Sequence, residues 1–380
     1  MNILKKIFPI LLGTLAISSA NADVDNCAPV NDKCSTACEP CAPCCEIPKA
    51  PKIQGYNQNA RISVCCTNDL YATATFLWIQ PIQEQMDFAL RKFNMPSGNI
   101  NTLYNQNFEW KPAFKAGLGY HFNYDNWDSF IEYTRINSCM NSIVNLGDSG
   151  GFLNDFWSLQ GVTGVYFTNF SEAKSKWNLD FNVFDFNFGR TYYNGTKLKF
   201  KAHYGLKVGW INQKEKAESN FPADPFNLFV TAKFKSESWL IGPRAGICSD
   251  WDLCKNFRFF GNGAISIFYQ KFYRITDREV NKLLLGDGLW AMAADYSNSM
   301  INSSLEGIIG FGYGSYFDRN KWHIDLAIGY EMQLFFNQNM MRYLQQTQND
   351  VLLGQQSVKI VSKAGNLMFH GLNITAKIEF

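Results

Sequence analysis

Residues 371–380 read Gly371-Leu-Asn-Ile-Thr-Ala-Lys-Ile-Glu-Phe380. The even-numbered residues of this stretch, from Leu372 to Phe380, are apolar, and the odd-numbered residues from Asn373 to Glu379 are polar. Because successive side chains of a strand point to opposite faces, this period of two predicts a β-strand with one apolar face. Ten residues are enough for a tilted strand to cross a lipid bilayer.

The same alternation recurs along the chain, for example in residues 110–122, 198–210 and 322–336. These runs are longer than the five or six residues that are usual for strands of soluble sheets, which argues against a secreted β-sandwich. Trp and Tyr gather towards the ends of the runs, as in the aromatic girdles of membrane proteins. We therefore expect an all-β chain that forms a transmembrane antiparallel β-barrel of about 12–14 strands, with 16 strands as an alternative.

The N-terminal residues have the features of a secretory signal peptide. Lys5 and Lys6 precede an apolar run over residues 7–17, and Ala20-Asn21-Ala22 is typical of a cleavage site. We expect residues 1–22 to be removed, residues 23–69 to form a Cys/Pro-rich irregular extension, and residues 70–380 to form the barrel. An exported barrel is expected in the bacterial outer membrane, in contact with its lipid.

The chain contains 11 cysteines, most of them in the N-terminal extension. In an exported protein, disulfide bonding is favoured over metal binding, and no histidine lies near these cysteines. An odd number leaves one thiol free or bonded to another chain, so disulfide links to envelope proteins or self-association are also expected. The disulfide candidates are Cys27, Cys34, Cys38, Cys41, Cys44, Cys45, Cys65, Cys66, Cys248 and Cys254.

The polar faces of the predicted strands carry more basic than acidic residues, although the net charge of the chain is only +2. Rings of Lys and Arg in a pore favour anions, which suggests a mildly anion-selective channel, whereas charges at strand ends would only reach the headgroup region. The predicted pore-lining residues are Lys111, Lys115, Lys197, Lys199, Lys201, His203, Lys207, Lys233, Arg244, Arg258, Glu306, Asp325, Glu331 and Lys377.

Catalytic and cofactor motifs are not found. The four histidines lie on separate predicted strands without metal-ligand spacing, and no G-x-S-x-G sequence is present. We expect no enzyme activity, no metal and no cofactor. The nearly neutral net charge gives no reason to expect a nucleic-acid partner.

Several stretches together resemble a known family. Leu70-Tyr-Ala-Thr-Ala-Thr-Phe-Leu-Trp-Ile-Gln-Pro81 is similar to its first strand, Trp239-Leu-Ile-Gly-Pro-Arg-Ala-Gly246 to its W-x-x-G-P-R-x-G motif, and residues 322–336 and 365–380 to its last two strands. This is the Legionella-type major outer membrane protein family, which also occurs in chlamydia-like bacteria. The resemblance implies a pore-forming barrel, surface adhesion as a second role, and a position facing the pore for Arg244.

The function we expect is an outer-membrane pore for passive diffusion of small hydrophilic solutes or ions. The alternative is a structural envelope protein or surface adhesin that uses the barrel as an anchor and is disulfide-linked to its neighbours. The aromatic C-terminus, Phe380, resembles the outer-membrane assembly signal of bacterial barrels. It predicts recognition of the last strand by the barrel-assembly machinery.

Overall fold

The computed structural model describes residues 60, 62, 64, 69–95, 98–122, 125–146, 152–155, 168–220, 229–254, 256–281, 290–342, 344–346, 359–361 and 364–380. These residues form strands almost throughout, which confirms the predicted all-β class. Among them, no helix is long and apolar enough to cross a membrane. The proposed signal peptide, and the cysteines from Cys27 to Cys66, lie outside the described residues.

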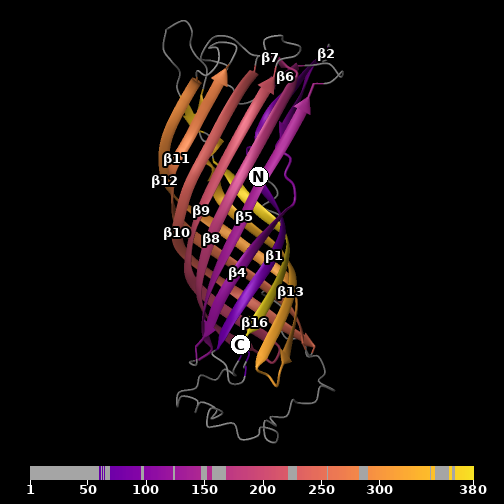
Figure 1. Ribbon diagram of the computed structural model, residues 1–380, viewed down its shortest axis with the longest axis vertical. Coiled ribbons are helices and arrows are strands. Elements are labelled where there is room, and N and C mark those ends of the chain that lie inside the picture. Colours follow the sequence, from indigo (N-terminus) through magenta and orange to yellow (C-terminus); the bar gives the residue numbers. More distant parts are fainter. Residues whose placement is uncertain are drawn as a thin grey trace, which may run out of the picture. The chain divides into compact units, whose positions relative to one another are not determined.

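The described strands include ten that close into an antiparallel barrel (Figure 1). In order around the ring they are β1 (Leu70–Gln83), β16 (Gly365–Glu379), β13 (Trp322–Asn339), β12 (Trp290–Phe317), β11 (Phe257–Asn281), β10 (Phe229–Cys254), β9 (Leu198–Asn220), β8 (Glu172–Asn194), β5 (Trp127–Asn145) and β4 (Lys111–His121). Other strands lie outside the ring: a four-stranded sheet of β3 (Gly98–Asn105), β2 (Asp87–Met95), β6 (Phe152–Asp155) and β7 (Thr168–Phe170), and the pair β14 (Leu344–Gln346) and β15 (Lys359–Val361). A short 3-10 helix, η4 (Met340–Arg342), follows β13.

The ring has fewer strands than the 12–14 predicted from the sequence, because its strands are longer than expected. Residues 229–235 and 239–248 show alternation as two separate runs in the sequence, but both belong to β10, which has 26 residues. A register shift between Glu237 and Ser238 in the pairing of β10 with β11 lies between those two runs. The extra residue of this irregularity is Tyr273 in β11, so β10 keeps its alternation. Its outer face changes from charged at Lys233 and Lys235 to apolar at Trp239 and Ile241, and this change makes one long strand look like two in the sequence.

The seam of the barrel joins the first strand to the last. β1 pairs with β16 from Tyr71↔Glu379 to Gln83↔Leu367. At the end of the seam, the Leu70 amide donates to the Phe380 carbonyl at 3.2 Å, and the Phe380 amide donates to the Leu70 carbonyl at 3.0 Å. The Phe380 ring also lies against Trp322, with the two ring centres 5.6 Å apart. Phe380 therefore contacts both strands that flank β16, namely β1 and β13.

The outer surface of the barrel is a belt of exposed apolar side chains. Ile301 is 75% exposed and Leu118 is 63% exposed. A contiguous apolar surface of this size would be unfavourable in water. On β10 the belt runs from Trp239 to Trp251, which corresponds to about 12 residues at ~3.3 Å each, or roughly 28 Å of height at a tilt of ~45°. That height matches the hydrocarbon thickness of a bilayer.

Six neighbouring strands, β5 and β8–β12, extend beyond the belt and form a taller part of the wall (Figure 1). β12 has 28 residues, but its pairing with β13 runs only from Ser304↔Phe335 to Phe317↔Trp322. Short connections, such as residues 195–197 and 318–321, lie at the end that holds Leu70 and Phe380, whereas the long connections lie at the other end. Short turns are typical of the periplasmic end of such barrels, so the tall part of the wall is assigned to the outer side.

The cysteines of β10 correct one prediction. Cys248 and Cys254 are free thiols, together with Cys139 on β5. Cys248 and Cys254 lie on one extended strand, six residues or about 20 Å apart along it. The Cα atoms of a disulfide-bonded pair lie less than about 7 Å apart, so these two cysteines cannot be bonded to each other.

Candidate functional site

A cavity of about 400 Å³ lies inside the barrel and is surrounded by polar and charged side chains. The lining comes from strands all around the ring, and Ala60 and Ile62, which precede β1, also contribute. Strand periodicity explains why the cavity lining is charged. On each strand, the polar residues alternate with the apolar residues of the outer belt, so they must point inward. The cations of the lining are Lys115, Lys199, Lys201, Arg244, Arg258 and Lys377, and the carboxylates are Asp128, Glu132, Asp250, Glu306, Asp325, Glu331 and Glu379.

One group of charges joins β8, β9, β10 and β12. The Lys207 ammonium lies 2.7 Å from Asp185 and 2.7 Å from Glu306, and its side chain is only 2% exposed. Arg244 reaches the same two carboxylates, at 2.6 Å from Glu306 and 3.4 Å from Asp185, and donates to Asn187 at 2.7 Å. Two cations therefore share two carboxylates, which balances the charge of this group.

A second group joins β4, β5, β13 and β16. The Lys115 ammonium is 2.5 Å from Glu331 and 3.6 Å from Glu132. The other Glu331 oxygen accepts a hydrogen bond from the Asn373 amide at 2.6 Å. Lys115 and Glu331 lie on strands that are not neighbours in the ring, so this ion pair reaches across the interior.

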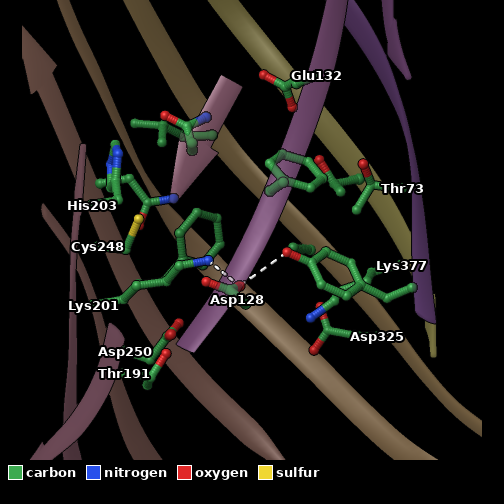
Figure 2. A pocket seen from close by; sticks show the side chains of 18 of the residues that line it. Thr73, Asp128, Glu132, Thr191, Lys201, His203, Cys248, Asp250, Asp325 and Lys377 are labelled. Carbon is green, nitrogen blue, oxygen red and sulfur yellow. Dashed lines mark hydrogen bonds and ion pairs between the residues drawn. The ribbon is translucent and has the colours of Figure 1, made fainter. Parts of the chain in front are cut away.

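Further pairs line the half of the cavity nearer the short turns. Figure 2 shows Lys201 directed at Asp128, which also accepts a hydrogen bond from the Tyr71 hydroxyl at 3.0 Å. Arg258 binds both oxygens of Asp325 and lies 3.0 Å from Asp250. Each cation is thus held by a carboxylate rather than left open to the lumen.

Beyond the cavity, on the side of the tall wall, aromatic side chains from opposite walls meet. Phe181 on β8 has its ring centre 5.2 Å from that of Phe335 on β13 and 4.9 Å from that of Phe369 on β16. These three residues, here called the aromatic closure, are almost completely buried and belong to a larger apolar cluster of inward-facing residues. In the ring β8 lies opposite β13 and β16, so the closure fills the interior at this level.

Most of the predicted pore-lining residues face the interior. Those in the cavity lining are Lys115, Lys199, Lys201, His203, Arg244, Arg258, Glu306, Asp325, Glu331 and Lys377, and Lys207 is buried beside Glu306.

Three predicted residues lie elsewhere. Lys197 is exposed in the turn between β8 and β9. Lys111 begins β4 and is paired with the exposed Glu109 at 2.7 Å. Lys233 is exposed on the outside of β10, because it lies an odd number of residues from the inward-facing Arg244 on the same strand.

Sequence reasoning missed Asp128, Asp250 and Tyr71, which lie in the cavity lining. The alternation of this strand is clear in the sequence only over residues 129–137, which leaves Asp128 outside it, whereas β5 begins at Trp127. A strand that starts two residues earlier places an acid on the inward face beside Lys201.

The W-x-x-G-P-R-x-G motif has a local packing reason. Gly246 lies two residues after Arg244 on the same inward face of β10. A Cβ at Gly246 would lie 2.5 Å from the backbone oxygen of Gly263 and 2.6 Å from Nε2 of His203, so the missing side chain makes room for both neighbouring strands. The motif thus places the Arg244 guanidinium next to Gly246, a position where the absence of a side chain leaves room for the neighbouring strands.

Comparison with known proteins identifies the family. The family model described as "Legionella pneumophila major outer membrane protein precursor" matches residues 63–380. No curated protein matches.

Solved barrel structures are only distantly similar. The outer membrane protease OmpT of Escherichia coli is 11% identical with a TM-score of 0.36, and covers 84% of this chain and 99% of its own. A Pseudomonas aeruginosa FadL homologue is 7% identical with a TM-score of 0.23, over 82% of this chain and 90% of its own. The family model covers most of the chain, and the chain therefore belongs to the Legionella pneumophila major outer membrane protein family and is a protein of the bacterial outer membrane.

Proposed function

We propose that the protein is a narrow channel for small hydrophilic solutes or ions. The observation that supports this proposal is the cavity of about 400 Å³, lined by charged side chains inside an apolar outer belt. A polar interior is characteristic of transmembrane barrels that conduct water-soluble molecules. No catalytic role is proposed.

The aromatic closure is proposed as the narrowest point of the channel. Phe181, Phe335 and Phe369 meet across the interior, so a solute that has passed the charged cavity must displace at least one of these rings. Exchange of solute then depends on motion of aromatic side chains rather than on a permanently open tube.

Ion selectivity is proposed to be weak. The anion preference expected from the sequence required an excess of unpaired cations, but Lys207, Arg244 and Lys115 each lie against at least one carboxylate. Paired charges present a small net field to a passing ion. The reversal potential across a bilayer in a salt gradient measures this preference, and a strong preference for either sign would contradict it.

Single-channel recording in a planar bilayer tests the channel itself. Full-length protein is expected to give small conductance steps, and Phe335→Ala is expected to increase them because it removes one ring of the closure. Phe311→Ala is the matched control: Phe311 is exposed on the outer face of β12, so conductance should not change. An equal conductance for Phe335→Ala and the unchanged protein would place the narrowest point elsewhere.

The second candidate function is a structural envelope protein or adhesin anchored by the barrel. The filled interior favours it, since barrels of eight strands fill their lumen with side chains and this ring is only slightly larger. Absence of conductance from both the unchanged protein and Phe335→Ala would support this candidate. Disulfide links to neighbouring molecules would accompany it, and different gel mobility with and without reductant would reveal them.

A further inference from the structure

The outer face of the tall wall carries a dense group of basic residues. β8, β9, β10 and β11 place four cations in one row, because their registers pair Lys176 with Lys216, Lys216 with Lys233, and Lys233 with Arg278. A second row, nearer the apolar belt, pairs Lys214 with Lys235. We call these six residues the basic face.

All six side chains point away from the interior. Their strand neighbours Trp177, Glu215 and Phe234 are buried and face inward, so the residues between them must face outward. Lys176, Lys214 and Lys233 are exposed. The basic face is therefore available to a molecule that approaches the wall from the side.

Nearby carboxylates balance only part of this charge. Lys216 pairs with Glu218, Lys235 with Glu237 at 2.6 Å, and Arg278 with Asp295 at 2.6 Å. Within the described part of the chain, Lys176 and Lys214 have no carboxylate within ion-pair distance. Like charges placed directly opposite on neighbouring strands repel one another, so the part of this charge that no carboxylate balances favours an anionic partner.

The height of the two rows indicates the kind of partner. Trp210 and Trp239 are paired at the upper edge of the apolar belt. The lower row lies four residues beyond them and the upper row six, which is roughly 9 Å and 14 Å of height for ~3.3 Å per residue and a tilt of ~45°. A phospholipid headgroup layer is only about 5–7 Å thick, so its phosphates lie below both rows, and further below the upper row than the lower one.

We propose that the basic face binds the headgroup of a phosphorylated glycolipid in the outer leaflet of the outer membrane. Such a headgroup carries phosphates on a saccharide tall enough to meet both rows, while its acyl chains lie against the belt below Trp210 and Trp239. Lysine ammoniums bind phosphate as point charges, which suits a headgroup with several phosphates. This interaction is independent of whether the lumen conducts.

Binding of purified lipids to full-length protein in detergent micelles tests the proposal. The lipids are a bisphosphorylated diglucosamine glycolipid, the same glycolipid without phosphates, and phosphatidylglycerol. The unchanged protein should prefer the bisphosphorylated glycolipid. Each lysine near a lipid surface is worth about fivefold in affinity, so Lys176→Gln with Lys216→Gln and Lys233→Gln should weaken binding about 100-fold.

The matched control removes three exposed cations from turns at the other end of the barrel: Lys197→Gln, Arg319→Gln and Lys321→Gln. It makes the same change in net charge and should leave glycolipid affinity unchanged. Migration of unheated samples on a gel confirms that both variants form closed barrels. The proposal is overturned if the first triple variant binds as well as the control. It is also overturned if the dephosphorylated glycolipid or phosphatidylglycerol binds as tightly as the bisphosphorylated form.

Discussion

Replacement of Lys207 with Met tests whether the charged interior is dry or filled with bulk water. The Lys207 side chain is 2% exposed and lies 2.7 Å from both Asp185 and Glu306. Lys207→Met leaves two carboxylates with Arg244 as their remaining partner in this group. Removal of one member of a buried ion pair costs about 3–5 kcal/mol, whereas an exposed pair contributes about 1 kcal/mol or less.

The double variant Lys207→Met with Asp185→Asn is the matched comparison. It removes one charge of each sign and keeps the 2.6 Å pair between Arg244 and Glu306. Because replacing both partners of a buried pair is often close to neutral, we expect the double variant to recover most of the stability that the single variant loses. Urea unfolding in lipid vesicles, followed by tryptophan fluorescence, gives the free energy of unfolding of each protein.

Two results would refute this reasoning. A loss below about 1 kcal/mol for Lys207→Met would mean that water solvates the group as at a surface. A double variant no more stable than Lys207→Met would mean that the two side chains are not coupled. The first result would favour a wide, hydrated lumen over the closed interior described above.

Three further predictions follow from single contacts. A variant that retains only Cys248 and Cys254 should form no intramolecular disulfide under oxidation. Maleimide labelling after denaturation counts the free thiols that remain. Loss of both thiols to a bond between them would contradict the extended path of β10. Gly246→Ala should destabilise the barrel by about 1–3 kcal/mol, because its Cβ would lie 2.5 Å from the Gly263 backbone oxygen and 2.6 Å from the His203 ring. Adding His203→Ala removes only the second clash and should restore part of the loss in the same urea assay. Phe380→Ala should lower the fraction of the protein that is assembled in the outer membrane. Immunoblotting of cell fractions measures the assembled protein against the total. Unchanged assembly would show that Phe380 is not part of the proposed assembly signal.

The barrel class could be predicted from the sequence because apolar and polar residues alternate wherever a strand has one face in lipid and the other in the lumen. Residues 371–380 show this directly, since their even positions are apolar and they lie in β16. The strand number was harder to predict. Above the belt, the outer face of β10 carries charged residues such as Lys233, and its inward face carries Val230 and Phe234, so the apolar and polar faces exchange places.

The same exchange explains the misplacement of Lys233. Within the belt, a lysine can only face the lumen, so Lys201 and Lys207 were assigned correctly to the interior. Beyond the belt, Lys233 faces outward and its buried neighbour Phe234 faces the interior. The aromatic closure was not predicted for a related reason: Phe181 and Phe335 come from distant parts of the chain, and only the ring order brings them together.

The seam between β1 and β16 affects how well the barrel tolerates insertions into its connections. Its partners, such as Tyr71 and Glu379, are separated by almost the whole barrel sequence. The entropy of closing so long a segment grows only with the logarithm of its length, and doubling it would cost about 0.6 kcal/mol. Insertions into the long connections should therefore barely affect closure. The long connections can diversify in length while the ring stays intact.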